Sequence, residues 1–228
     1  MAAQTDAPGW FGKLSMLGDF ASRRLSSEWI RPCDEWLSAS LRTSQERLGE
    51  RWLATYLATP VWRFAWAPGI VDGHWWFGIL MPSCDKVGRY FPLVVAQQRQ
   101  QPPIDRFALD HLEWWWGHLA RAGLDTLADG ASLDVFEQAL LDAPPWPTAT
   151  GPAWSRPLSA NGRERHAVAD GAGLNHLAQD LAAEGLRQRL AGKSFWWPLR
   201  GEPGSGSCTL AAGLPSATAF ADLLTGDW

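Results

Sequence analysis

Apolar residues recur at spacings of three and four in several stretches of the chain, which is the periodicity of an amphipathic helix. The first stretch reaches about residue 45 and follows Ser26 and Ser27, either of which can cap a helix. Its apolar positions are Ile30, Cys33, Trp36, Leu37 and Leu41. Similar spacing predicts helices over residues 49–58, 102–122, 133–143, 173–190 and 215–225. We expect Gly123 to cap the C-terminus of the long helix over 102–122 and Ser132 to cap the next one.

Between these stretches, three segments are rich in aromatic and β-branched residues and are separated by turn formers. They cover residues 61–67, 74–81 and 87–97. Because short turns join neighbouring segments, the pattern predicts an antiparallel meander. Polar residues rarely alternate in these segments, so both faces of the sheet should be covered. A strand over 10–14 and a hairpin formed by 195–199 and 208–212 are also predicted.

Together these elements favour an α+β fold, a mainly antiparallel sheet flanked by helices on both faces. The helices over 30–58 and 104–141 should cover the two faces, in a longin-like or profilin-like arrangement. We divide the chain into a core over 1–143, a proline-rich surface connection over 144–168 and a C-terminal part over 169–228. The C-terminal part should pack a helix, a hairpin and a last helix on the same core, so we expect one domain.

Composition and charge exclude several classes of function. The 228 residues are 46% apolar, and 20 basic residues stand against 24 acidic ones, which gives a net charge of −4. Because no basic stripe is present, we expect no nucleic-acid partner. The longest apolar run, 75–81, is much shorter than the ~20 residues of a membrane helix. Since the N-terminus also lacks a secretion signal, we expect a cytoplasmic protein without membrane insertion.

Tryptophan is the most unusual feature of the composition, with 16 copies, several of them adjacent. The adjacent groups are Trp75 with Trp76, Trp114 to Trp116, and Trp196 with Trp197. We expect one member of each group in the core and another covering a neighbouring element or forming a partner-binding patch. The three cysteines, Cys33, Cys84 and Cys208, are too widely spaced for a disulfide framework or a zinc ribbon. We expect them to be reduced and buried.

Two loops mix charged, glycine and aromatic residues in a way that neither a core strand nor an ordinary turn requires. The candidate site residues are Lys13, Gly18, Asp19, Phe20, Arg23, Ser83, Asp85, Gly88 and Arg89. The first loop lacks the glycine spacing and the Lys-Ser/Thr pair of a phosphate loop, so no nucleotide is expected. His111 and His118 lie about 10 Å apart along a helix without further ligands, so no metal is expected, nor another cofactor.

The second loop is compatible with three interpretations. As a structural turn, Ser83 and Asp85 would bond the backbone and Arg89 would pair with an acid such as Asp19. As a partner or ligand site, the same residues would recognise another molecule. As a catalytic site, Ser83 or Asp85 would need a base within hydrogen-bond reach, which His74 could supply from across the hairpin. The residue types favour a turn or a binding role over catalysis, so we expect no enzyme activity.

Several motifs in the first 97 residues resemble those of one protein family. They include Trp10-Phe11-Gly12-Lys13-Leu14, Gly18-Asp19-Phe20, Trp62-Arg63-Phe64, Val87-Gly88-Arg89 and Phe91-Pro92-Leu93. In these motifs the chain is similar to the TagF family, also called ImpM, accessory proteins of bacterial type VI secretion systems. The resemblance implies a cytoplasmic protein that represses the secretion apparatus after translation and works with a forkhead-associated scaffold protein.

Three hypotheses for the function follow. The leading one is a non-enzymatic regulator that binds another protein through the two loops. The second is an enzyme that acts on a small molecule or a phosphoprotein with Ser83, Asp85 and Arg89. The third is a structural module whose exposed tryptophans drive homo-oligomerisation or docking to the secretion apparatus.

Overall fold

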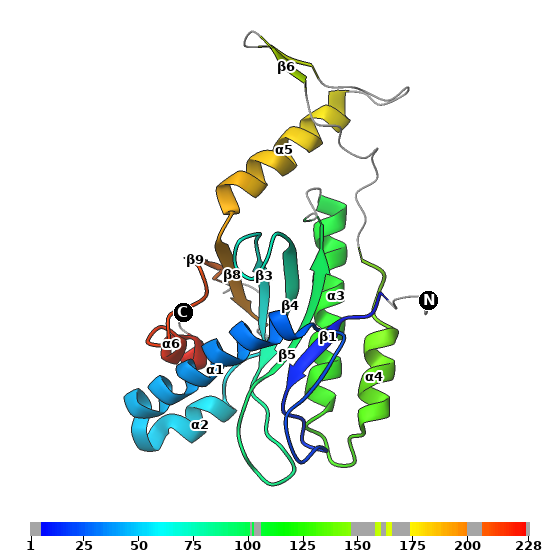
Figure 1. Cartoon of the computed structure of the whole chain (residues 1–228). Coiled ribbons are helices and arrows are strands. Elements are labelled where there is room, and N and C mark those ends of the chain that lie inside the picture. The colour runs from blue at the N-terminus through cyan, green and yellow to red at the C-terminus, as the bar shows by residue number, and fades with distance from the viewer. Residues whose placement is uncertain are drawn as a thin grey trace.

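One antiparallel sheet organises the part of the chain that the structure describes (Figure 1). In this computed structural model, the described residues are 6–100, 102, 106–146, 158–160, 163–165, 174–199 and 207–226. The strands of the sheet, in spatial order, are β2 (Ala21–Arg23), β1 (Gly9–Gly12), β5 (Leu93–Arg99), β4 (Trp75–Met81), β3 (Trp62–Trp66), β8 (Lys193–Pro198) and β9 (Thr209–Ala212). Two short strands, β6 (Leu158–Ala160) and β7 (Arg163–Arg165), form a separate hairpin. The predicted meander is thus extended by N-terminal strands on one side and by the C-terminal hairpin on the other.

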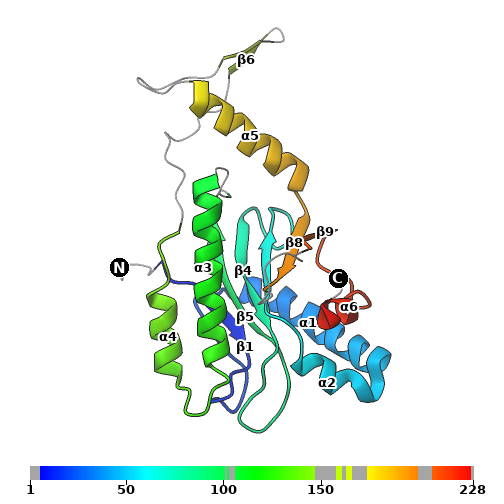
Figure 2. The same cartoon turned by 180° about the vertical axis from the view of Figure 1, so that it is seen from behind.

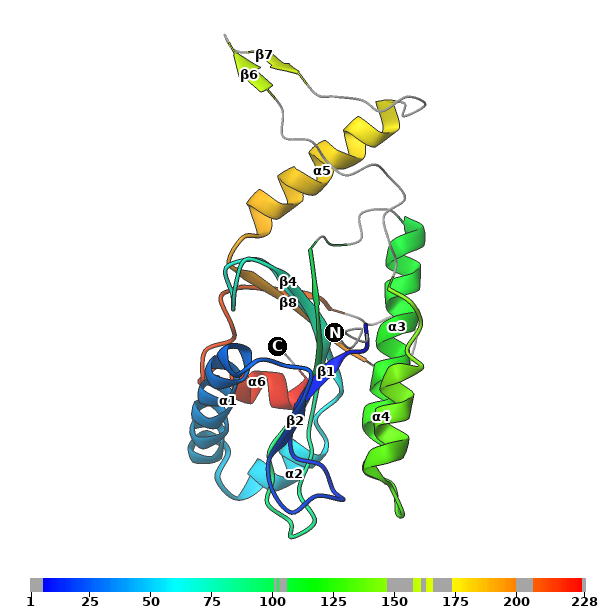
Figure 3. The same cartoon turned by 45° about the vertical axis from the view of Figure 1, so that its right-hand side comes forward.

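Helices lie on both faces of the sheet, as Figure 3 shows. One face carries α1 (Ser27–Leu48), the 3-10 turn η1 (Gly49–Arg51), α2 (Trp52–Leu57) and α6 (Phe220–Thr225). The other face carries α3 (Arg106–Asp125) and α4 (Leu133–Leu141). The remaining helix, α5 (Leu174–Leu190), extends away from the sheet and leads into β8. The predicted α+β fold is therefore confirmed.

Helix boundaries follow their sequence signals at some positions and depart from them at others. Ser26 and Ser132 are the N-caps of α1 and α4, and each side chain accepts a backbone N–H three residues later. The predictions at Pro215 and Gly123 are wrong, because α6 begins only at Phe220 and α3 continues through Gly123. A Cβ at Gly123 would lie 2.7 Å from the Met81 sulfur, so this glycine allows α3 to approach β4 closely.

The predicted strand over 87–97 begins six residues too early. Residues 85–91 form a narrow loop, in which the N–H of Asp85 donates to the carbonyl of Arg89 at 3.1 Å and that of Phe91 donates to the carbonyl of Ser83, also at 3.1 Å. Regular pairing with β4 starts at Leu93, opposite Met81. These loop hydrogen bonds replace the ladder that the aromatic and β-branched residues suggested.

Neighbouring tryptophans of β4 are buried on opposite faces of the sheet. Trp75 belongs to the core under α3 and Trp76 to the core under α1, with 2% and 7% of their surfaces exposed. The expectation that one member leaves the core is therefore wrong for this pair, because helices cover both faces of β4. It is confirmed in α3, where Trp114 is 63% exposed next to the buried Trp115.

The three cysteines differ in their exposure to solvent. Cys33 is buried, whereas Cys84 is half-buried and Cys208 is exposed, so burial is wrongly predicted for two of the three free thiols. Cys84 lies in a loop, and Cys208 immediately precedes the edge strand β9.

Within the predicted proline-rich connection the structure describes β6 and β7, while residues 147–157, 161–162 and 166–168 lie outside the described residues. Of the described helices, none has the length and apolar character needed to cross a bilayer.

Gly78 in the middle of β4 provides a test of this packing. A Cβ at this position would lie 2.0 Å from the Val95 carbonyl oxygen and 2.6 Å from the ring of Phe64. Gly78→Ala should therefore lower the free energy of unfolding by about 1–3 kcal/mol in a urea titration. Gly117→Ala in α3 is the matched control, because nothing lies within 4 Å of its Cβ, and it should raise stability by about 0.5–1 kcal/mol. Equal effects of the two substitutions would contradict the close approach of β4 and β5.

Candidate functional site

The buried carboxylate of Asp85 is the centre of the candidate site. Asp85 lies in the loop that joins β4 to β5 and is 2% exposed. Its Oδ2 accepts hydrogen bonds from Lys13 Nζ at 2.8 Å and Arg89 Nε at 2.7 Å. Its Oδ1 accepts from the backbone N–H groups of Val87 at 3.1 Å and Arg89 at 2.9 Å. Because a carboxylate offers about four acceptor positions, these donors saturate it.

The same contacts keep Asp85 ionised. Burial by itself would raise the pKa of Asp85, but the hydrogen bonds from Lys13, from Arg89 and from the N–H of Val87 hold this pKa well below its usual range. Two cations thus share one anion inside a loop. Removing the anion would leave the ammonium group of Lys13, which is 4% exposed, without its partner.

Further hydrogen bonds join two loops that are far apart in the sequence, residues 13–20 and residues 82–91, which we call the paired loops. The Ser83 hydroxyl donates to the Lys13 carbonyl at 2.7 Å. The N–H of Lys86 donates to the Leu17 carbonyl at 2.9 Å, and Arg89 Nη2 donates to the Gly18 carbonyl at 2.6 Å. The paired loops therefore form one unit beyond the end of β4, at the lower end of Figure 1.

Gly88 supplies the backbone conformation that closes the second loop. Its φ of 82° lies in the left-handed region, which favours glycine. Its N–H donates to the carbonyl of Asp85 at 3.0 Å, so the chain turns back toward Arg89 within a few residues. This turn places the N–H of Arg89 on the same carboxylate that its guanidinium contacts.

Tyr56 of α2 anchors the paired loops to the core and was not identified from the sequence. Its hydroxyl donates to the Ser83 carbonyl at 2.9 Å and accepts from the Ser83 N–H at 3.0 Å. Burial raises the pKa of Tyr56. The sequence signal was present, since a tyrosine on the buried side of an amphipathic helix needs a partner for its hydroxyl, but the periodicity did not reveal which residue it would be.

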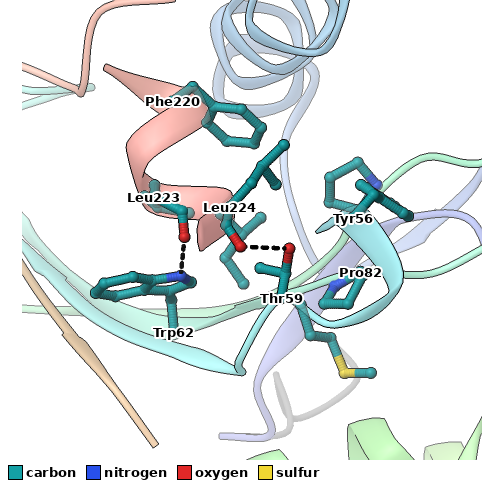
Figure 4. A pocket seen from close by; sticks show the side chains of 10 residues that line it. Tyr56, Thr59, Trp62, Pro82, Phe220, Leu223 and Leu224 are labelled. Atoms are coloured by element: carbon teal, nitrogen blue, oxygen red, sulfur yellow. Dashed lines mark hydrogen bonds between the residues drawn. The ribbon is translucent and has the colours of Figure 1, made fainter. Parts of the chain in front are cut away.

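Next to Tyr56, the end of α6 closes a small apolar junction, shown in Figure 4. Trp62 Nε1 donates to the Leu223 carbonyl at 3.0 Å, and the Thr59 hydroxyl donates to the Leu224 carbonyl at 3.1 Å. These bonds satisfy carbonyl groups at the C-terminal end of α6. The space left between the side chains is about 10 Å³, at the lower limit for one water molecule. The junction is therefore a packing contact between α6, β3 and α2.

Arg23 is the candidate residue that lies elsewhere. It pairs with Trp10 across β1 and β2, at the end of these strands farther from the paired loops, and its guanidinium is 3.7 Å from Glu137. Glu137 of α4, which the sequence analysis missed, also accepts from Arg24 Nη1 at 2.5 Å and from Trp10 Nε1. Sequence periodicity treats Glu137 as a polar helix position and gives no sign that β1 and β2 reach it.

The proposed catalytic base and the histidine pair are also separated from the paired loops. His74 follows the turn before β4, where its N–H donates to Asp72 Oδ1 at 2.8 Å. His118 Nε2 lies 2.7 Å from the Ala139 carbonyl, a contact between α3 and α4. Among the described residues, no three side chains of histidine, cysteine, aspartate or glutamate are grouped to hold a metal ion.

The outward surface of the paired loops combines apolar and charged side chains. Phe20 is 47% exposed and Val87 is 65% exposed. The ring of Phe20 is supported from behind by the ring of Phe91 at 4.8 Å and by Lys13 Nζ at 4.9 Å. The other exposed side chains of this surface, which we call the loop face, are those of Asp19, Lys86 and Arg89. The loop face thus presents two exposed apolar side chains together with three charged ones.

Fold and site define an α+β protein whose sheet, covered by helices on both faces, supports a loop surface held by hydrogen bonds. The chain matches the family model described as "TagF N-terminal domain, Type VI secretion system-associated" over residues 9–143. Since this match covers more than half of the chain, the chain belongs to the TagF family of type VI secretion system-associated proteins. The paired loops lie inside the matched range.

A solved structure extends the similarity beyond the family domain. The crystal structure of PA0076 from Pseudomonas aeruginosa PAO1 at 2.05 Å resolution is 36% identical in sequence, with a TM-score of 0.73. The similarity covers 96% of this chain and 94% of that chain, so it includes the C-terminal hairpin and α6. None of the curated proteins compared with the chain matches it.

The lowered pKa of Asp85 predicts a pH-dependent contribution to stability. Because the folded-state pKa lies below the unfolded value of about 3.9, this contribution is present above that value and is lost as the pH falls toward the folded-state pKa. Asp85→Asn should lower the urea midpoint at neutral pH, and the difference from wild type should shrink below about pH 4. Asp19→Asn is the control, because Asp19 is exposed and 3.9 Å from Arg89. A difference in urea midpoint that stays constant as the pH falls below about 4 would contradict this account.

Tyr56→Phe tests the anchor of the paired loops. The substitution keeps the ring but leaves the N–H of Ser83 unpaired and removes one of the two donors to its carbonyl, which should cost about 1–3 kcal/mol of unfolding free energy. Tyr90→Phe is the matched control, since no hydrogen bond of the Tyr90 hydroxyl is found among the described residues, and it should change stability by less than about 0.5 kcal/mol. Chemical denaturation of both variants measures the difference. Equal losses would show that the Tyr56 hydroxyl does not anchor the loop.

Proposed function

We propose that this protein is a non-enzymatic, post-translational repressor of a type VI secretion system, which acts in the cytoplasm by binding a forkhead-associated scaffold protein. The repressor role and the partner come from the TagF family resemblance. The proposal assigns binding to the loop face, formed by Asp19, Phe20, Lys86, Val87 and Arg89. The observation that carries this assignment is that the buried part of the paired loops is saturated with hydrogen bonds while its apolar tip is exposed.

The hydrogen bonds within the paired loops support a binding role. Asp85, Ser83 and Tyr56 link the two loops to each other and to α2 before any partner arrives. A surface that is already ordered loses little conformational entropy on association, so more of its contact energy contributes to affinity. Phe20 and Val87 offer apolar surface for a hot spot, and the charges around them can set specificity.

The chemistry of the loop residues also favours binding over catalysis. Ser83 is 3% exposed, and its hydroxyl donates to the backbone carbonyl of Lys13 rather than to a side-chain base that could activate it. The carboxylate of Asp85 is ionised, and its acceptor positions are occupied. The expected role of these groups is to hold the loops in shape.

Val87→Glu tests the proposal with little risk to the fold, because the side chain is 65% exposed. A carboxylate in the centre of an apolar contact should weaken binding to the purified scaffold protein at least about tenfold, measured by isothermal titration calorimetry. In cells, the variant should release secretion from repression. The thermal midpoint of the variant should remain close to that of the wild-type protein.

Val135→Glu is the matched control, since Val135 is 67% exposed on α4, outside the paired loops. It introduces the same side chain at the same exposure and should leave both affinity and repression unchanged. Unchanged affinity of the Val87 variant would contradict the assignment to the loop face, and failure of the wild-type protein to bind the scaffold would contradict the choice of partner.

A further inference from the structure

The two edges of the sheet differ in how they are protected from pairing with another strand. The sheet ends at β2 on one side and at β9 on the other, and Figure 2 shows β9 at the outer side of β8. At the β2 edge, Arg23 lies 3.7 Å from Glu137, and the next residue, Arg24, has a φ of 60° and so ends the extended conformation. Charges and bends of this kind keep an edge from accepting a further strand.

The β9 edge lacks such charges. Residues 207–214 include no charged residue and no proline. The side chain of Leu210 is 44% exposed, and Ala212 is exposed as well. Among the described strands, β8 alone pairs with β9. The outer side of β9 is therefore an uncharged edge that can accept another strand.

The hydrogen bonds of β8 show which backbone groups of β9 point outward. The carbonyl of Lys193 accepts from the N–H of Ala67 at 3.0 Å, so the backbone groups of Lys193 face β3. Ala212 lies opposite Lys193 in the register, and its own backbone groups therefore point away from β8. Because this direction alternates along a strand, the backbone groups of Leu210 also point outward. These two residues offer N–H and C=O groups to a new strand.

A second copy of β9 is complementary to this edge. In an antiparallel pair with a two-fold axis at Ala211, Leu210 of each copy lies opposite Ala212 of the other, and each such pair can exchange both of its backbone hydrogen bonds. A large side chain then lies beside a small one on the α3 side of the sheet, the side that Leu210 shares with its neighbour Phe195. Because the strand is uncharged, its pairing with itself brings no like charges together.

We infer that β9 pairs with β9 of a second copy, so that two sheets join edge to edge in a symmetric dimer. The two-fold register favours a second copy over a strand of another protein, since it matches Leu210 with Ala212 twice in one contact. A strand of 4 residues buries little surface, so the dimer should be weak and reversible. This contact lies outside the paired loops and does not rest on the proposed function.

Analytical ultracentrifugation of the full chain tests the association. The weight-average mass should rise from that of a monomer toward that of a dimer between about 2 and 200 µM, with a dissociation constant of about 10–100 µM. A reducing agent is present throughout, because Cys208 is exposed and could otherwise form a disulfide. A monomer at every concentration would overturn the inference.

Leu210→Pro and Leu210→Ala separate backbone pairing from side-chain contact. Proline removes the outward N–H without removing a hydrogen bond to β8, so it should weaken the dimer at least about tenfold. Alanine removes the same side chain but keeps the N–H, so it should weaken the dimer less than proline does. Equal weakening by the two variants would show that the backbone of β9 does not make the contact. The thermal midpoints of both variants show whether the fold is retained.

Cysteine cross-linking tests the register without relying on the proline variant. In a chain with Cys208→Ser, Ala211→Cys places two thiols opposite each other across the axis, where the Cα atoms of a non-hydrogen-bonded pair lie about 4.5 Å apart, within the range of a disulfide. Mild oxidation with copper–phenanthroline should therefore link the two copies. Thr209→Cys in the same background is the control, because the two thiols would lie about 13 Å apart along the strands and should not link. Equal cross-linking of both variants, or none of the Ala211 variant, would overturn the inferred pairing.

Discussion

The buried carboxylate of Asp85 is the interaction on which the functional end of this protein depends. It is shared by two side-chain cations and two backbone N–H groups, and one of these donors, Lys13, lies 72 positions before Asp85 in the sequence. Low solvent access makes each of these charge-assisted bonds strong and makes the loss of any partner costly. Because Asp85 orders both loops, the exposed Phe20 and Val87 are presented on a fixed frame. The loop face is therefore a consequence of one buried charge.

The second constraint is that the central strands are covered on both faces. Trp75 and Trp76 show its effect, since adjacent residues of β4 are buried in two separate cores. Helices α1, α2 and α6 lie on one face and α3 and α4 on the other, so both tryptophans of this pair are buried.

Much of the fold could be predicted from the sequence, because helical periodicity, capping residues and turn formers are local signals. The caps at Ser26 and Ser132 and the antiparallel meander are examples. The predictions that failed depend on contacts between segments that are far apart in the sequence. The segment 87–92 has strand-like residues, but the hydrogen bonds to Asp85 hold it as a loop. Tyr56 and Glu137 have partners on distant elements, so neither could be recognised as a connecting residue from spacing alone. Motif resemblance, rather than periodicity, identified the family. The mixture of charged, glycine and aromatic residues pointed to the paired loops, which hold eight of the nine candidate residues.

We expect the paired loops to be ordered already before they meet a partner. Amide hydrogen exchange of the free protein and of its complex with the scaffold protein tests this claim most directly. The N–H groups of Val87 and Arg89 donate to Asp85, so they should be protected in the free protein, and added protection in the complex should centre on residues 13–20 and 82–91. Rapid exchange of these two amides in the free protein would contradict the account.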